Sequence, residues 1–380
     1  MNSTKLSGIY IHIPFCVRKC LYCDFLSFSN MEDRFDDYVQ ALIREIRMID
    51  YNEPVDSIFF GGGTPSVLKS DYIKNILDEL YKKFDIADDC EISMEMNPAT
   101  LTINNLKGYV EAGINRASIG MQSTNNEELK ALGRIHLYND FLKAYEYVRN
   151  VGITNVNVDI MSAIPGQTVK SYEQTLDRVM RLKPEHISSY SLILEEGTPF
   201  YEMDNKGLLV LPGEEDERIM YHMTKDVLAS EGYLRYEISN YSRANYESRH
   251  NIKYWRRQDY IGLGLGAASL VGNKRYNNTS DIREYIRNAG FGDIRINVEE
   301  LTKENKIEET MYLGLRMMSG VNKREFFETF DMELEKIYGN VIKNLEKEKL
   351  IKNDEKSIVL TEFGVDVSNR VLSEFLLDIL

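Results

Sequence analysis

Ile13-Pro-Phe-Cys16-Val-Arg-Lys-Cys20-Leu-Tyr-Cys23-Asp-Phe25 is the stretch from which the rest of the chain can be interpreted. Its three cysteines, with three and then two residues between them, fit on one loop, and no fourth cysteine lies nearby. Thiolates are soft ligands that suit zinc or an iron–sulfur cluster. A structural zinc ion is held by four protein groups, whereas three thiolates on a four-iron cluster leave one iron free for a small molecule.

Two other interpretations of these cysteines stay open. His12 could complete a zinc site, or three free cysteines could lie together by chance, because free cysteine is a common core residue. Cys90 stands alone in the middle of the chain, and we expect it to pack in the core.

Length and composition set the class of protein. The 380 residues are 43% hydrophobic, which is enough for one large domain and a smaller one. The 46 basic and 60 acidic side chains give a net charge of −14, so we expect no nucleic-acid partner. No apolar run approaches the length of a transmembrane segment, and the first residues do not resemble a signal peptide. We therefore expect a cytoplasmic protein, whose thiols stay reduced.

Strand and helix patterns alternate over roughly the first two hundred residues. The first strand runs from Gly8 to Pro14, and the next strands are predicted at 55–60, 91–97, 117–122, 155–161 and 186–194. Helical spacing of apolar residues falls between them, at 32–50, 69–84, 102–112, 138–150 and 170–182. This order predicts an α/β fold with a parallel sheet.

The strands at 91–97, 117–122 and 155–161 carry one polar face. Parallel strands covered on both sides read as continuous apolar runs, so the alternation indicates a curved sheet with helices outside and a polar, ligand-holding interior. Ligands of such sheets gather at the carboxyl ends of the strands. The cysteine loop and Gly61-Gly62-Gly63-Thr64-Pro65 both fall there.

The pattern changes to charged helices at about residue 284, which divides the chain into 1–283 and 284–380. Within the second part, the run from Ile358 to Gly364 is typical of the β-hairpin of a winged-helix-like domain. Winged helices often bind DNA, but a fold does not imply a function. The acidic balance favours a structural or docking role.

The CxxxCxxC spacing resembles the signature of the radical S-adenosylmethionine (SAM) enzymes. The flanking Tyr10-Ile-His-Ile-Pro-Phe-Cys16 and Tyr22-Cys23-Asp-Phe25 are similar to the branch that contains oxygen-independent coproporphyrinogen III oxidase and a related haem chaperone. The resemblance implies a partial, open barrel of six β/α units followed by a mostly helical, winged-helix-like domain. It also implies that Cys16, Cys20 and Cys23 hold a [4Fe-4S] cluster, whose free iron chelates the amino and carboxylate groups of SAM.

The resemblance implies a SAM site as well. Gly62, Gly63 and Thr64 match the loop along the methionyl part, and the other matching positions are Tyr10, Tyr22, Glu95, Gln122, Arg134 and Asp159. Carboxylates suit ribose hydroxyls and an ammonium group, while arginine suits a carboxylate. If the resemblance is set aside, the alternative is that the glycines only form a turn and that each polar residue only makes hydrogen bonds within the protein interior.

The segment His250-Asn251-Ile-Lys-Tyr254-Trp255 matches the HNxxYW motif associated with haem binding in the chaperone branch. Imidazole is a common haem ligand, and the two aromatic rings could pack on a porphyrin face. This implies that His250 ligates the haem iron. The alternative is a histidine packed in the core beside aromatic residues.

Two differences separate the chain from the oxidase. The oxidase has a further cysteine at the position where this chain has Phe25. The oxidase also has a long extension before its first strand, whereas the first strand of this chain starts at Gly8. The resemblance therefore implies a haem chaperone without coproporphyrinogen oxidase activity, which passes haem to an unidentified acceptor protein and could contact a membrane protein transiently. The alternative is the oxidase itself, a radical SAM decarboxylase of porphyrin biosynthesis. A structural zinc protein is the third possibility.

Overall fold

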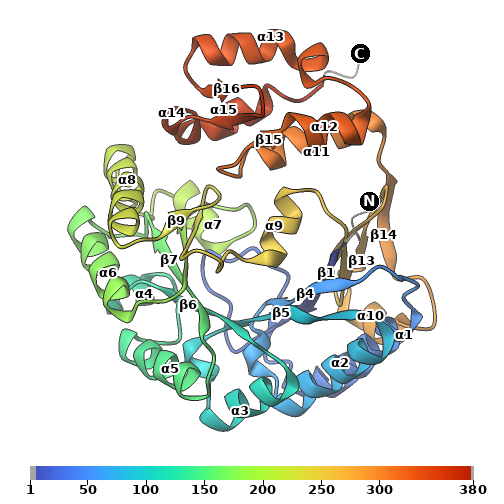
Figure 1. The fold of residues 1–380 in the computed structure, drawn as a ribbon. Helices are drawn as coiled ribbons and strands as arrows, with labels where there is room; N and C mark the ends of the chain where they lie inside the picture. Colours follow the sequence, from blue (N-terminus) through green and yellow to red (C-terminus); the bar gives the residue numbers. More distant parts are fainter. Residues whose placement is uncertain (1–5, 378–380) are drawn as a thin grey trace.

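The computed structural model describes residues 6–377, and its larger part is built on a twelve-stranded sheet (Figure 1). Six parallel strands lie side by side in chain order: β1 (Ser7–Ile13), β4 (Val55–Gly62), β5 (Ile86–Met96), β6 (Arg116–Gln122), β7 (Asn155–Ser162) and β8 (His186–Ser191). They confirm the six predicted strands, although β8 ends three residues earlier than expected. The sheet curves without closing, so the predicted open α/β barrel is also confirmed.

Further strands extend the sheet at both edges. β11 (Tyr260–Leu263) lies parallel to β1, and β12 (Ala268–Val271), β13 (Lys274–Asn278) and β14 (Arg295–Glu300) continue from it in antiparallel fashion. At the other edge, β10 (Asn240–Ser242) and β9 (Leu234–Arg235) add two short antiparallel strands. The sequence interpretation did not predict that residues after 230 join this sheet.

Helices cover the outer face of the curved sheet, as the alternating pattern predicted (Figure 1). They are α1 (Phe35–Met48), α2 (Ser70–Lys83), α3 (Ile103–Ala112), α5 (Tyr138–Asn150) and α6 (Val169–Leu182). Each buries one apolar face, which on α1 includes Tyr38, Leu42 and Ile46. Thr102 caps the start of α3, and Gly113 ends it in the left-handed conformation with φ of +119°.

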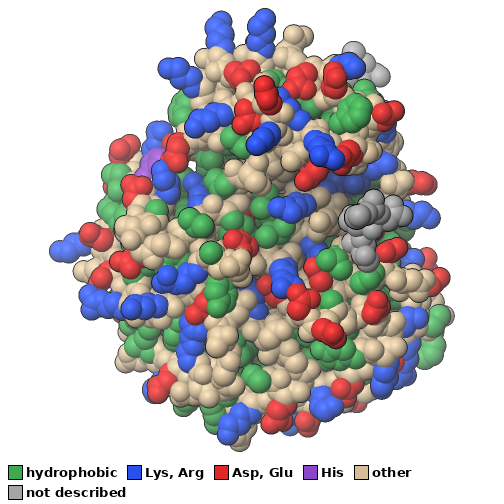
Figure 2. Space-filling model, in the orientation of Figure 1, with side chains coloured by type: hydrophobic (Ala, Val, Ile, Leu, Met, Phe, Trp, Pro, Cys, Tyr) green, Lys and Arg blue, Asp and Glu red, His purple; other side chains and the backbone are tan. Residues whose placement is uncertain are grey.

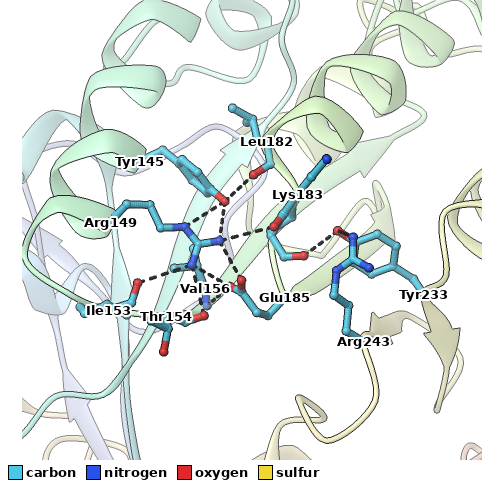
Figure 3. A network of polar contacts seen from close by, with 11 residues as sticks. Tyr145, Arg149, Ile153, Thr154, Val156, Leu182, Lys183, Glu185, Tyr233 and Arg243 are labelled. Carbon is cyan, nitrogen blue, oxygen red and sulfur yellow. Dashed lines mark hydrogen bonds and ion pairs between the residues drawn. The ribbon is translucent and has the colours of Figure 1, made fainter.

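A polar network ties the outer helices to the amino ends of β7 and β8 (Figure 3). The Arg149 guanidinium of α5 lies 2.8 Å from the Glu185 carboxylate, which also accepts a hydrogen bond from the backbone N–H of Val156. Arg149 donates to the Tyr145 hydroxyl, which itself donates to the carbonyl of Leu182. These contacts hold the strands in register at the end of the sheet away from the cysteine loop.

The C-terminal part has its own apolar core and is mostly helical. It contains α11 (Lys303–Gly314), α12 (Lys323–Phe330), α13 (Leu334–Lys347), α14 (Glu362–Asp366) and α15 (Ser368–Ser373) with a three-stranded sheet of β15 (Val321–Asn322), β17 (Ser357–Leu360) and β16 (Ile351–Asn353). The hairpin predicted at 358–364 is misplaced, because β16 and β17 form it. The Thr361 hydroxyl accepts from the backbone N–H of Gly364 and starts α14 instead.

The predicted division of the chain at residue 284 stays a prediction. The outer ends of the two predicted parts, residues 1–5 and 378–380, lie outside the described part of the chain. α10 (Ile282–Asn288) packs against α1, where Arg44 donates to the carbonyls of Ile286 and Ala289. β14 then joins the large sheet, while the second apolar core begins at Ile307. Over residues 6–377, no helix is long and apolar enough to cross a membrane.

Candidate functional site

A cavity of about 150 Å³ opens at the carboxyl ends of the parallel strands. It brings together most of the residues predicted for the cluster and for SAM: Cys16, Cys20, Tyr22, Cys23, Gly62, Gly63, Thr64, Glu95, Gln122, Arg134 and Asp159. These residues come from loops and strand ends spread over about 140 residues of sequence. We call this cavity the cysteine pocket.

Backbone hydrogen bonds hold the cysteine loop over the sheet. Leu21 donates to the carbonyl of Leu132, and Phe200 donates to the carbonyl of Leu21. The three thiols are partly buried; Cys16 Sγ lies 3.4 Å from Thr64 Oγ1, and Arg134 donates to Cys20 Sγ at 3.6 Å. Burial raises the pKa of the Cys23 thiol to about 11. A metal bound there has to displace a proton, so its binding depends on pH.

The donor set fits an iron–sulfur cluster better than the two alternatives considered from the sequence. His12 cannot complete a zinc site in this arrangement, because its Nε2 bonds to the carbonyl of Leu26 and its Nδ1 to the Tyr10 hydroxyl. Within residues 6–377, no three His, Cys, Asp or Glu side chains converge on one point. A cluster does not need that convergence, since each thiolate binds a different iron. Cys90 is 5% exposed and lies outside the pocket, as expected for core packing.

The glycine loop leaves no room for side chains. Gly62 has φ of +109°, and a Cβ added to it would lie 2.5 Å from the His12 ring, while one on Gly63 would lie 2.7 Å from the carbonyl oxygen of Phe15. Gly63 N–H donates to the carbonyl of Ile13, and Thr64 N–H donates to that of Phe15. The loop is therefore fixed directly against the strand that leads into the cysteines.

Two partly buried carboxyl groups, those of Glu95 and Asp159, face the same pocket. Burial, and then the nearby Asp159 carboxylate, raise the pKa of Glu95 to about 8, against the opposing effect of the hydrogen bond from the N–H of Gly62, 3.2 Å away. Burial also raises the pKa of Asp159, against the hydrogen bond from Asn157 Nδ2 at 2.7 Å and that from the Ser118 hydroxyl. Such a pair favours a ligand that carries a positive charge or donates hydrogen bonds.

Gln122 and Arg134 leave polar atoms without partners at the pocket. A bulge in β6 and a φ of +62° turn Gln122 out of the regular strand geometry. Its Oε1 is buried and has no hydrogen-bond partner in the described chain, and the same holds for Arg134 Nε. Arg134 is held by the carbonyl of Gly120, 2.8 Å from Nη2. Buried polar atoms nearly always have partners, so these two fit a bound ligand.

The structure separates the two predicted tyrosines. Tyr22 lines the pocket, and burial raises the pKa of its hydroxyl. Tyr10 lies deeper and does not line it: its hydroxyl bonds to His12 Nδ1 at 3.1 Å, and its ring stacks on Phe59. A role for Tyr10 at SAM stays a prediction.

The HNxxYW segment forms α9 (Arg249–Trp255), between the curved sheet and the C-terminal part (Figure 1). His250 is 1% exposed; its Nδ1 lies 3.1 Å from the Ser57 hydroxyl and its Nε2 lies 2.9 Å from the Tyr254 hydroxyl. Burial, and then the charge of Lys253, lowers the pKa of His250 to about 3. A Cβ on Gly8 would touch this ring, so His250 lies at the amino ends of the strands, opposite the cysteine pocket.

The same helix leaves Asn251 and Trp255 in different surroundings. Asn251 N–H donates to the Ser248 hydroxyl that caps α9, and Trp255 lines a larger cleft beside the C-terminal part. The prediction that His250 ligates haem iron stays a prediction, and in this conformation both ring nitrogens already have partners.

Sequence reasoning missed a buried chain of hydrogen bonds that connects the two ends of the barrel. Asn157, which holds Asp159, lies 2.6 Å from His186 Nδ1. His186 Nε2 bonds to the Tyr236 hydroxyl, which accepts from the backbone N–H of Ser248 at the start of α9. The alternation of β7 pointed to Asn157, but no local pattern marks His186 or Tyr236.

Comparison with known proteins agrees with this geometry. Residues 10–179 match the model of the Radical SAM superfamily, and residues 301–367 match that of the HemN C-terminal domain. The fold is also that of coproporphyrinogen III oxidase (HemN) from Escherichia coli, with a TM-score of 0.85, 23% identity, and coverage of 98% of this chain and 90% of that one. The fold and the cysteine pocket therefore define a protein of the radical SAM class.

Proteins with higher sequence identity to this chain identify its family within the radical SAM class. The haem chaperone HemW of Lactococcus lactis is 37% identical over 98% of both chains, and HemW of Bacillus subtilis is 37% identical over 98% of this chain and 99% of its own. HemW of Escherichia coli is 38% identical over 70% of each chain. The chain belongs to the HemW family.

Proposed function

We propose that this protein is a haem chaperone, which binds haem, SAM and a [4Fe-4S] cluster and transfers haem to an acceptor protein. The observation that carries the proposal is the 37% identity to HemW chaperones along 98% of the chain. The HNxxYW segment supports it, because that resemblance is independent of the cysteine signature.

The cysteine pocket would hold the cluster and SAM. Cys16, Cys20 and Cys23 would bind the cluster, which when present supplies redox chemistry and a free iron for SAM. Arg134, fixed by Gly120, suits the carboxylate of the methionyl group, and Glu95 with Asp159 suits its ammonium and the ribose hydroxyls. The rigid loop at Gly62 and Gly63 lets the backbone approach this ligand closely.

Coproporphyrinogen oxidation is the second candidate, and it is the weaker one. The likeness to the oxidase is 23% in sequence and shows the fold alone. Phe25, which stands where the oxidase carries a further cysteine, lines the pocket and is 60% exposed. A phenyl ring cannot replace a thiol in metal or radical chemistry.

One preparation tests both candidates. Anaerobically reconstituted protein is titrated with haem and, separately, incubated with coproporphyrinogen III, SAM and a reductant. We expect about one haem per chain and no decarboxylated product. Decarboxylation of coproporphyrinogen III in the absence of haem binding would contradict the chaperone function and support the oxidase function.

We also infer that the protein works in the cytoplasm, on an acceptor that can include a membrane protein, and not on nucleic acid. Acidic and basic side chains are interspersed on the face in Figure 2, with a net charge of −14 for the chain. Such a surface would release few counterions from the phosphates of a DNA duplex, so it would bind DNA weakly. Submicromolar DNA binding in a gel-shift assay at physiological salt would contradict this inference.

A further inference from the structure

The charged side chains that line the cysteine pocket are divided by sign. Arg18 and Lys19, between the first two cysteines, make the loop side of the pocket basic. Glu95 of β5 and Asp159 of β7 make the strand side acidic. Because the whole chain carries a net charge of −14, the basic loop is a local exception that needs a physical reason.

Lys19 closes the part of the loop that holds two of the three cysteines. Its ammonium donates to the carbonyl of Phe25 at 2.9 Å, and the same carbonyl accepts from the Ser27 hydroxyl at 3.2 Å. Cys20 and Cys23 both lie in the segment that the Lys19 hydrogen bond spans. The carbonyl is neutral, so this contact fixes Lys19 without cancelling its positive charge.

Arg18 connects the loop to Arg134 in the same way. Its Nη2 donates to the Arg134 carbonyl at 3.1 Å, and the Arg134 guanidinium donates to Cys20 Sγ at 3.6 Å. Both Arg18 and Lys19 are exposed, and neither forms an ion pair with a carboxylate among residues 6–377. Like charges held close together repel one another, so this arrangement becomes favourable when an anion lies among them.

The cluster proposed for this loop has the sign of charge that the two cations require. Three thiolates outweigh the two positive charges of an oxidised four-iron core, so the whole group is an anion, and one added electron makes it more negative. The potential of such a cluster depends on nearby charge and on hydrogen bonds to its sulfurs. Cations on the loop therefore stabilise the reduced form more than the oxidised form.

We propose that Arg18 and Lys19 are positioning residues for the [4Fe-4S] cluster, which clamp the cysteine loop and raise the reduction potential of the cluster through their charges. This proposal rests on the cluster of the proposed function and adds two residues to its site. The redox couple concerned takes up one electron and leaves the bonds to the three cysteines intact.

The test measures the midpoint potential of the reconstituted full chain by anaerobic titration with dithionite and redox mediators. Arg18→Gln with Lys19→Gln removes both cations from the loop. Lys143→Gln with Lys170→Gln is the matched control, since these exposed lysines on α5 and α6 also form no ion pair among the described residues. At a fixed potential, we expect the ratio of reduced to oxidised cluster to fall about tenfold in the loop pair, or about 59 mV for one electron, and less than twofold in the control pair.

An exchange of the two side chains separates their charge from the shape of the loop. Arg18→Lys with Lys19→Arg keeps both charges, so we expect its reduced-to-oxidised ratio to stay within twofold of the unaltered chain. Equal potentials in the glutamine pair and the control pair would overturn the proposal, and so would an equally large fall in the exchange pair. Loss of iron and sulfide from the glutamine pair alone would support it. Failure of the unaltered chain to take up a cluster would instead remove the cluster from the proposed function.

Discussion

The two ends of the barrel interior differ in how their polar groups are satisfied. At the carboxyl ends of the strands, Gln122 and Arg134 keep buried atoms without partners in the described chain, and Glu95 has a raised pKa. At the amino ends, both nitrogens of His250 are hydrogen-bonded, and the Lys253 ammonium lies 2.5 Å from Asp56. The first end has its unpartnered atoms at a pocket. At the second end His250 and Lys253 are paired within the protein, and the unpartnered atoms there, Arg116 Nε and Asn155 Oδ1, do not line that pocket.

The largest effect is expected at the cysteine loop. Cys20→Ser removes one of three thiolates, so we expect reconstituted protein to lose its cluster, which in the unaltered chain corresponds to about four iron and four sulfide per chain. Iron and sulfide counts provide the measurement, with the buried Cys90→Ala as the matched control. A full cluster in Cys20→Ser, or a stoichiometric zinc ion in the unaltered chain, would refute this assignment.

At the opposite end, Lys253→Met should affect stability and not ligand binding. It leaves Asp56 as an uncompensated charge in a pair whose side chains are 4% and 14% exposed, and such losses cost about 3–5 kcal/mol. Urea unfolding measures the change, and adding Asp56→Leu should restore part of it. A weaker SAM affinity in Lys253→Met would show that the two ends are not independent.

Asp159→Ala tests the ligand end directly. Loss of a hydrogen bond to a charged group costs about 1.5–3 kcal/mol, so SAM should bind roughly tenfold to a hundredfold more weakly in calorimetry on reconstituted protein. Asp177→Ala, an exposed position on α6, is the control. Unchanged affinity in Asp159→Ala would place SAM elsewhere.

Glu95 should make the unfolding free energy depend on pH. Its pKa in the folded chain is about 8, against an ordinary value of 4.5, so between these values the folded state keeps a proton that the unfolded state has lost. Stability from this group is complete below pH 4.5 and falls as the pH rises toward 8, by at most about 1.4 kcal/mol per pH unit. Glu95→Gln should flatten that slope in urea unfolding. An unchanged slope would mean that Glu95 is ionised in the folded chain.

The smallest effect concerns the hydrogen-bond chain between the two ends. His186→Leu removes the contact that holds Asn157, and through it Asp159, at a cost of about 1 kcal/mol. We expect SAM affinity to fall about fivefold, while His222→Leu on α8 (Glu214–Ser230), whose side chain is 40% exposed, leaves it unchanged. If the two variants bind SAM equally, His186 serves the fold alone.

Local spacing predicted much of this molecule. The cysteine loop, the positions of the six parallel strands along the chain and the polar face with Glu95 and Asp159 all follow from residues a few positions apart. The structure brings the cysteine loop and this polar face into one pocket. The misplaced hairpin near 358 shows the limit of that reasoning. Ile358 to Leu360 does form a strand, but whether Glu362 continues it or starts a helix depends on the cap at Thr361.

Short patterns in the sequence are enough to predict the class of site, because the candidate ligands and the strand alternation are both local features. Which side of α9 borders a cleft depends on tertiary contacts instead. His250 is satisfied by Ser57, which is 193 residues away in sequence, and Trp255 borders a cleft completed by α11 and α12. Such contacts arise when the amino ends of the strands and the C-terminal helices pack on the same short helix, and no local pattern encodes that meeting.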